Sequence, residues 1–178
     1  MLRLIKIGYK RFSYILIVFT LMLSISGCSE KNDFEKYHNS SWGISISYPK
    51  KWVVQDTSVE NKLNVMFSKE EFNYSKANEA VVSLMGIKGN GGTDFVNQME
   101  ESVKSNKQII EEKDITLNKI KAKKIIVSET EESDKGYSIN YIFIKQGEKN
   151  CVILYSAKVD NAEYLKIIGN MINTLKFE

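Results

Sequence analysis

Apolar and polar residues alternate along much of the chain after residue 40, a period that predicts β-strands with one buried face. The alternation is clearest over residues 43–48, where serines separate Ile44, Ile46 and Tyr48. Further segments with strand character cover residues 52–54, 63–68, 79–88, 109–117, 120–128, 137–145 and 151–158. The last of these is apolar at almost every position, so we expect it at the centre of a sheet that helices cover on both sides.

Two segments show the period of an amphipathic helix. The first follows the glycine-rich residues 89–92, and Thr93 or Asp94 is its expected N-cap. Its apolar positions are Phe95, Val96, Met99 and Val103, which leaves Glu100, Glu101 and Lys104 outward. The second helix is expected to begin with a capping box formed by Asp160 and Glu163 and to extend towards Leu175.

Short turns join several of the expected strands. Asn118–Lys119 separates two of them, and Asn tolerates the positive φ that a tight hairpin requires. Residues 146–150 form a second hairpin loop. Successive hairpins make neighbouring strands antiparallel, so the predicted fold class is α+β, an antiparallel β-sheet flanked by helices. We expect one such domain over residues 41–178.

The first 27 residues have the pattern of an export signal. Basic residues occur at positions 3, 6, 10 and 11, and an uncharged, mostly apolar run follows over residues 12–27. This run is shorter than the ~20 residues that a membrane-spanning helix prefers. The positive charges hold the N-terminal side in the cytoplasm, so the remaining chain is expected to be exported.

The run ends in Ile25-Ser26-Gly27-Cys28, which resembles the lipobox of bacterial lipoproteins. In such proteins the thiol of the cysteine accepts a diacylglyceryl group, and a peptidase then cleaves before that cysteine. The resemblance implies cleavage between Gly27 and Cys28 and anchoring through lipidated Cys28 on the extracytoplasmic face of the cell membrane. An uncleaved signal anchor and an ordinary secretory signal with an incidental cysteine are the alternatives.

Charge and cysteine content limit the function classes. The chain has a net charge of +3, but without the basic residues of the signal the remainder is close to neutral. This removes the main reason to expect nucleic-acid binding. The only other cysteine, Cys151, lies in an apolar strand pattern and is interpreted as a small buried side chain rather than a nucleophile.

Residues 28–40 are predicted to be the lipidated cysteine and a polar tether without regular structure. The only histidine, His38, falls in this stretch and is interpreted as a solvated tether residue. A catalytic Ser-His or Cys-His pair would therefore need an imidazole from a flexible arm. The sequence also lacks GxSxG, HExxH and CxxC motifs, so we expect no cofactor and no catalytic residue.

One acidic run is a weak candidate for a metal site. It contains Glu129, Glu131, Glu132 and Asp134 at an expected hairpin tip. Calcium takes about six to eight oxygen ligands in a defined geometry, and the run lacks the order of a calcium-binding loop. A solvated loop that discourages edge-to-edge pairing is the main interpretation, and weak cation binding is the alternative.

The segment Tyr48-Pro49-Lys50-Lys51-Trp52 resembles the Tyr-Pro-x-x-Trp turn near the start of PsbP-like domains. The order of elements over residues 41–178, including the final strand pair and helix, is also similar. The resemblance implies a Mog1/PsbP-like α/β/α sandwich. Trp42 and Trp52, together with Tyr48, are expected to close one end of its core.

Members of that family are mostly non-catalytic. The photosynthetic ones assist assembly and ion retention at the oxygen-evolving complex, and another binds a nuclear-transport GTPase. The matching positions are fold positions, so no functional residue is carried over. We therefore expect a membrane-anchored, non-enzymatic module that binds or assembles another envelope protein. The alternatives are a lipoprotein that carries a small ligand or cation and, less favoured, an unusual hydrolase.

Overall fold

The computed structural model describes residues 33–71, 78–128 and 136–178. They belong to one compact unit that begins at Asp33 and ends at Glu178. Within these ranges, no helix has the length and apolar character needed to cross a bilayer.

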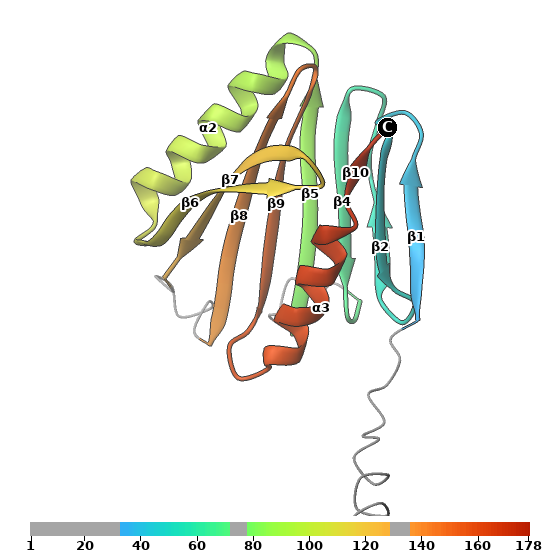
Figure 1. The fold of residues 1–178 in the computed structure, drawn as a ribbon, viewed down its shortest axis with the longest axis vertical. Helices are drawn as coiled ribbons and strands as arrows, with labels where there is room; N and C mark the ends of the chain where they lie inside the picture. The colour runs from blue at the N-terminus through green and yellow to red at the C-terminus, as the bar shows by residue number, and fades with distance from the viewer. Residues whose placement is uncertain (1–32, 72–77, 129–135) are drawn as a thin grey trace, which may run out of the picture. The chain divides into compact units, whose positions relative to one another are not determined.

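The larger sheet has seven strands, and every pairing in it is antiparallel (Figure 1). In spatial order the strands are β3 (Val53–Asp56), β4 (Lys62–Ser68), β5 (Ala80–Lys88), β9 (Lys149–Lys158), β8 (Tyr137–Gln146), β7 (Ile120–Val127) and β6 (Ile109–Leu117). The strand expected at the centre, β9, is the fourth of the seven. Its central position is therefore confirmed, as is the α+β class with an antiparallel sheet.

A second, three-stranded sheet has the order β1 (Phe34–Asn39), β2 (Ile44–Pro49) and β10 (Lys176–Phe177). The prediction of an irregular tether over residues 28–40 is wrong for residues 34–39, which pair with β2 along their whole length. Most of β1 is exposed, so its sequence lacks a clear apolar period. The domain starts at residue 33 instead of 41.

Tyr37 connects β1 to the larger sheet through a ring contact and a hydrogen bond. Its ring meets the Phe67 ring edge-on, with 5.5 Å between the centroids. Its hydroxyl donates a hydrogen bond to Asp56 Oδ2 at 2.5 Å. Burial and this bond raise the pKa of Tyr37 to about 12. A single aromatic side chain thus gives β1 contacts that its alternation pattern does not reveal.

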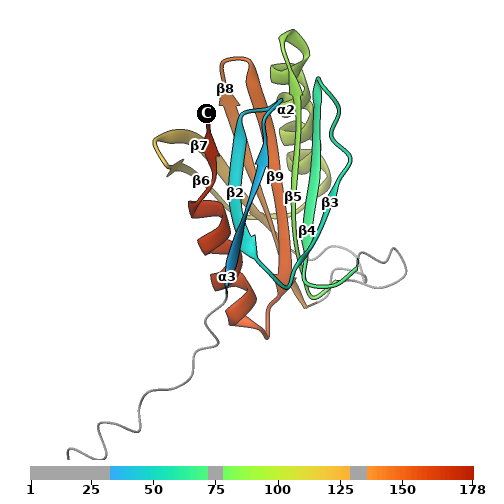
Figure 2. The same ribbon diagram turned by 90° about the vertical axis from the view of Figure 1, so that its right-hand side faces the viewer.

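The two helices lie on opposite faces of the seven-stranded sheet (Figures 1 and 2). Helix α2 (Asn90–Asn106) packs on β5, β9 and β8, over a core that includes Val96, Val103 and Phe143. Helix α3 (Ala162–Asn173) packs on β9 and β2, over a larger core shared by the two sheets. The sandwich therefore has one core on each face of the large sheet.

Both predicted helix caps are wrong. Helix α2 begins at Asn90, and its N-cap is Gly89 with φ of 74°, so Thr93 and Asp94 lie inside the helix. A Cβ atom at Gly92 would collide with the backbone oxygen of Ile87, so the missing side chain permits this close approach. Helix α3 has Asn161 as its N-cap without a side-chain cap bond, which shifts the start past Asp160.

The predicted turn at Asn118–Lys119 is confirmed, with φ values of 46° and 72° for the two residues. Leu117 and Ile120 are the last pair of the hairpin formed by β6 and β7. The Asn118 side chain also donates hydrogen bonds to the carbonyl oxygens of Asn173 and Leu175, both at 2.7 Å. These bonds attach the hairpin tip to the end of α3.

The predicted buried residues lie in the larger core. Trp42 and Cys151 are completely buried, Trp52 is buried, and Tyr48 is half-buried against the same cluster. Burial raises the pKa of the Cys151 thiol to about 12, so the thiol stays protonated at neutral pH. Its interpretation as a small buried side chain is confirmed.

Candidate functional site: a lysine-rich cleft

Most of the site residues predicted from sequence lie outside the described ranges. This applies to Gly27 and Cys28, and to the acidic candidates Glu129, Glu131, Glu132 and Asp134. Within the described ranges, no group of three or more His, Cys, Asp or Glu side chains is arranged to hold a metal ion. Lipidation and cation binding at these positions remain predictions.

His38 does not lie in a tether. It belongs to β1, opposite Ser45 of β2, and its Nδ1 atom is 3.9 Å from Glu178 Oε2. Ser45 donates a weak hydrogen bond to the other oxygen of the same carboxylate, at 3.4 Å. His38 therefore neighbours the fixed C-terminal end of the described chain, where Glu178 N donates to the Gly43 carbonyl at 2.6 Å.

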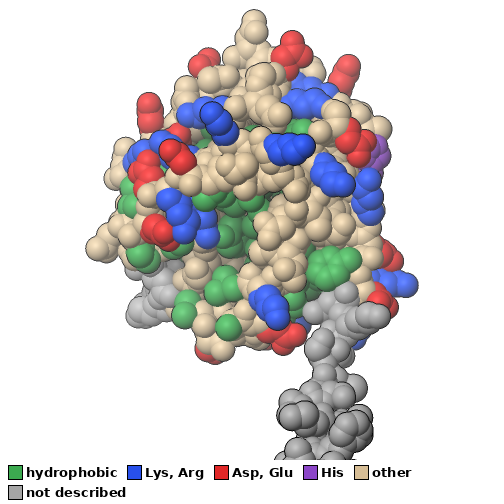
Figure 3. Space-filling model, viewed as in Figure 1, with side chains coloured by type: hydrophobic (Ala, Val, Ile, Leu, Met, Phe, Trp, Pro, Cys, Tyr) green, Lys and Arg blue, Asp and Glu red, His purple; other side chains and the backbone are tan. Residues whose placement is uncertain are grey.

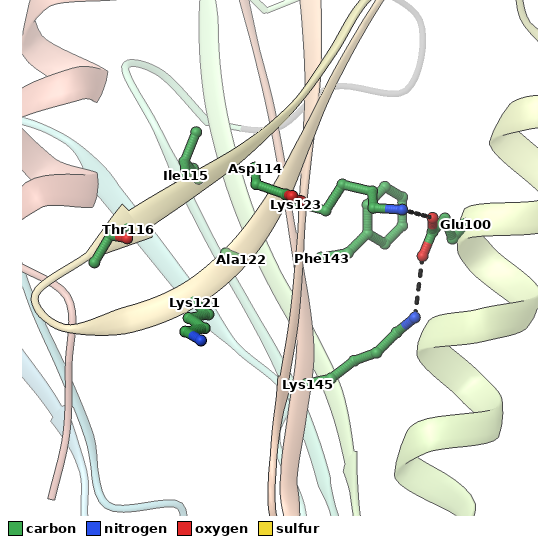
Figure 4. Close-up of a pocket in the computed structure, with 9 residues that line it drawn as sticks. All are labelled: Glu100, Asp114, Ile115, Thr116, Lys121, Ala122, Lys123, Phe143 and Lys145. Carbon is green, nitrogen blue, oxygen red and sulfur yellow. Dashed lines mark hydrogen bonds and ion pairs between the residues drawn. The ribbon is translucent and has the colours of Figure 1, made fainter.

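A cleft of about 550 Å³ opens between α2 and the β6–β7 hairpin (Figure 4). Strands β7 and β8 stop pairing at Ala122 and Ile144, although β7 starts at Ile120 and β8 continues to Gln146. The hairpin therefore diverges from β8 here. The cleft is lined by Glu100, Asp114, Ile115, Thr116, Lys121, Ala122, Lys123, Phe143 and Lys145.

Strand alternation places three lysines in this cleft. Lys121 and Lys123 are two residues apart on β7, and Lys145 follows the last β8 residue that pairs with β7. Successive strand residues point to opposite faces, so these side chains share the α2 face with Phe143, which is buried in the α2 core. Phe143 is buried at the base, whereas Lys121 and Lys145 are exposed.

Glu100 connects the helix to these lysines. Its Oε1 atom accepts hydrogen bonds from Lys123 at 2.9 Å and from Lys104 at 3.1 Å. Its Oε2 atom accepts one from Lys145, also at 3.1 Å (Figure 4). Glu112 of β6 pairs with Lys104 at 2.8 Å and with Lys123 at 3.2 Å. Strands β6, β7 and β8 and helix α2 are therefore joined by one ion-pair network.

The network fixes the charge of its members. Burial alone would raise the pKa of Glu100, but the hydrogen bonds from Lys123, Lys104 and Lys145 outweigh it and lower the pKa to about 2. The hydrogen bonds from Lys123 to Glu100 and Glu112 raise the pKa of that lysine. Neither group exchanges a proton near neutral pH. The cleft thus presents fixed charges suited to binding.

The prediction that Glu100 lies on the outward face of the helix is wrong. Its side chain is turned towards the sheet, and the residue is only 8% exposed. Three lysine ammonium groups compensate the buried carboxylate, an arrangement that the helical period alone does not reveal. The alternating lysines of β7 were a signal for it, because Lys121 and Lys123 share a face with the buried Ile125.

Comparisons with known proteins identify the fold. No protein-family model and no curated protein matches the chain. Cyanobacterial PsbP (CyanoP) from Synechocystis sp. PCC 6803 matches with a TM-score of 0.55 at 11% identity, over 87% of this chain and 99% of that protein. A Bacteroides thetaiotaomicron protein matches with a TM-score of 0.54 at 16% identity, over 81% of this chain and 48% of its own.

A weaker match is LpqN from Mycobacterium tuberculosis, described as involved in cell envelope biogenesis. It has a TM-score of 0.45 at 13% identity, over 81% of this chain and 90% of LpqN, and we base no argument on it. At these identities the likeness concerns the fold alone. The two sheets, the two helices and the nearly complete coverage of cyanobacterial PsbP show that this chain has a PsbP-like fold.

Proposed function

We propose that this protein is an extracytoplasmic lipoprotein whose PsbP-like domain binds, or helps to assemble, another protein of the cell envelope without catalysing a reaction. The observation that carries the proposal is the sequence Ile25-Ser26-Gly27-Cys28 at the end of the apolar run. Two acyl chains on Cys28 would anchor the protein stably, because each buried methylene contributes about 0.8 kcal/mol. The anchor restricts possible partners to the envelope.

The surface that carries α3 supports a binding role. Figure 3 shows hydrophobic side chains gathered in a hollow near the centre of this face, with lysines around it. Helix α3 packs on β9 and β2, and the half-buried side chains of Lys124 and Ile126 lie on the same face of β7 as Ala122. Exposed apolar surface of this kind is typical of protein interaction sites.

The electrostatics of this surface also fit a protein partner. Lys124 Nζ lies 5.5 Å from the centroid of the Tyr155 ring, a cation–π distance. Burial, followed by repulsion from Lys113, lowers the pKa of Lys124. A partner that brings an acidic side chain beside apolar ones would relieve this repulsion while it covers Ile126.

Lipidation and partner binding are tested separately. Metabolic labelling with a fatty acid should mark the wild type and not Cys28→Ala, and label that persists in Cys28→Ala contradicts the anchor.

For the partner, a photo-cross-linking amino acid at position 126 should give one discrete adduct in intact cells. The same residue at the exposed position 101 on α2 is the control. Equal adducts at both positions, or none at 126, would contradict the binding role.

A further inference from the structure

The lysine-rich cleft has an unbalanced charge. Its lining contains three lysines against two carboxylates, those of Glu100 and Asp114. Lys123 and Lys145 are paired with Glu100, but Lys121 has no hydrogen-bond or ion-pair partner among the described residues. A small anion would find one uncompensated ammonium group at the rim of this cleft.

The second lysine at the rim, Lys145, has more N–H donors than its bond to Glu100 uses. Lys121 and Lys145 each lie one position beyond the last β7–β8 pair, Ala122 and Ile144, and on the same face. The hairpin diverges from β8 beyond this pair, so the two lysines lie on different sides of the cleft (Figure 4). Lys145 donates one bond to Glu100, and an ammonium group has three N–H donors. An anion held in the cleft would offset the excess of positive charge and accept hydrogen bonds from both lysines.

The volume and the lining of the cleft suit an organic molecule better than a single ion. Its volume of about 550 Å³ falls within the ~300–1,000 Å³ of typical small-molecule sites. Phe143 supplies an apolar base, and the exposed Thr116 places a hydroxyl at the rim. The excess of lysine disfavours the cation-carrier alternative for this part of the molecule.

We propose that this cleft binds a small organic molecule through an oxyanion group, a carboxylate or a phosphate, held by Lys121 and Lys145 with its apolar part towards Phe143. The site lies on the α2 face, across the sheet from the surface proposed for the protein partner. It therefore does not depend on that proposal. Glu100 is a positioning residue here, because it holds the Lys145 ammonium group in place.

Isothermal titration calorimetry on the full chain in detergent, with benzoate and with inorganic phosphate as separate probes, tests the proposal. At least one probe should give saturable heat in the wild type. Lys121→Ala should weaken that affinity about tenfold, as expected for one lost charge-assisted hydrogen bond. The variant should fold, because Lys121 is exposed and unpaired among the described residues.

Lys113→Ala is the matched control, because it removes one positive charge from the same hairpin but on the opposite face, opposite Lys124. Its affinity should equal that of the wild type. Binding of benzoate alone indicates a carboxylate ligand, and binding of phosphate alone indicates a phosphorylated one. Absence of saturable heat with both probes overturns the proposal, as does an equal loss in Lys113→Ala, which would indicate non-specific attraction.

Discussion

At the scale of single residues, Glu100 has the most unusual environment. It is a helix residue whose carboxylate is buried between α2 and the sheet and accepts hydrogen bonds from three lysines. A buried carboxylate is tolerated only when it is paired, and the pairs with Lys123 and Lys145 also hold the helix against β7 and β8. Its contribution to stability should therefore depend on pH.

The direction of this pH dependence follows from the pKa of Glu100, which is about 2 in the folded protein against an ordinary 4.5. A lowered pKa stabilises the fold above the ordinary value and loses that effect as pH falls from about 4.5 towards 2. The limit is about 3 kcal/mol, at about 1.4 kcal/mol per pKa unit, and solvent around the lysines reduces it. Urea unfolding of the wild type and Glu100→Gln at several pH values measures the difference.

The free energies of unfolding of these two proteins should differ at pH 7 and approach each other at pH 2. Glu101→Gln is the control, because Glu101 is the exposed neighbour and its replacement should change stability little at any pH. A difference between the wild type and Glu100→Gln that stays constant across this pH range would contradict the assigned network.

Gly86 permits the close approach of β5, β9 and the Trp42 ring. A Cβ atom there would lie 2.7 Å from the Asn150 carbonyl oxygen and 2.9 Å from Trp42 Cη2. Gly86→Ala should therefore destabilise the protein by about 1–3 kcal/mol, as overpacking does. Gly169→Ala, inside α3 with no atom within 4 Å of its Cβ, should stabilise by about 0.5–1 kcal/mol. Urea unfolding that ranks the two variants the other way would contradict this packing.

At the scale of elements, β1 decides where the domain begins. It covers one edge of β2, pairs with it over six residues, and contributes Tyr37 to the junction between the sheets. Without β1, the buried positions of β2 would lose cover and its backbone would become an open edge, which favours aggregation.

A chain that starts at Asp33 should therefore unfold cooperatively in urea, whereas a chain that starts at Ser41 should be less stable and should aggregate. Tyr37→Ala in the longer chain separates the two contributions of β1. It removes the contact with Phe67 and the bond to Asp56 but leaves the backbone pairing. It should fall between the two chains in stability. Equal stability of all three would show that β1 is dispensable.

The elements also show what alternation in sequence can and cannot predict. Strands β2, β5 and β9 have buried faces, so their apolar periods identified them, and the positive φ of Asn118 was indicated by its residue type. Strand β1 is largely exposed, so it left no period. Glu100 was misplaced because two of the three lysines that compensate it come from β7 and β8, which are distant in sequence.

At the scale of the whole molecule, the early start of the domain shortens the link to the proposed anchor. Only residues 29–32 separate Cys28 from Asp33. Five peptide steps span at most about 18 Å, so a lipidated Cys28 would keep the start of β1 close to the bilayer. Lys50 N donates to the Asp33 carbonyl at 2.8 Å, which places the turn after β2 at the same end. The β8–β9 turn lies at the opposite end in Figures 1 and 2.

This geometry gives a test on vesicles that contain lipids with a quencher in the headgroup. A fluorophore on Lys50→Cys should be quenched strongly, and one on Glu148→Cys in the β8–β9 turn should be quenched weakly. Cys151 should not compete for the label, because it is completely buried and its pKa is raised to about 12. A long Gly/Ser insertion between Asn32 and Asp33 should remove most of the difference, since it frees the domain from the surface. Equal quenching at both positions without the insertion would contradict the short link, and with it the view that the end of the domain at the start of β1 faces the membrane.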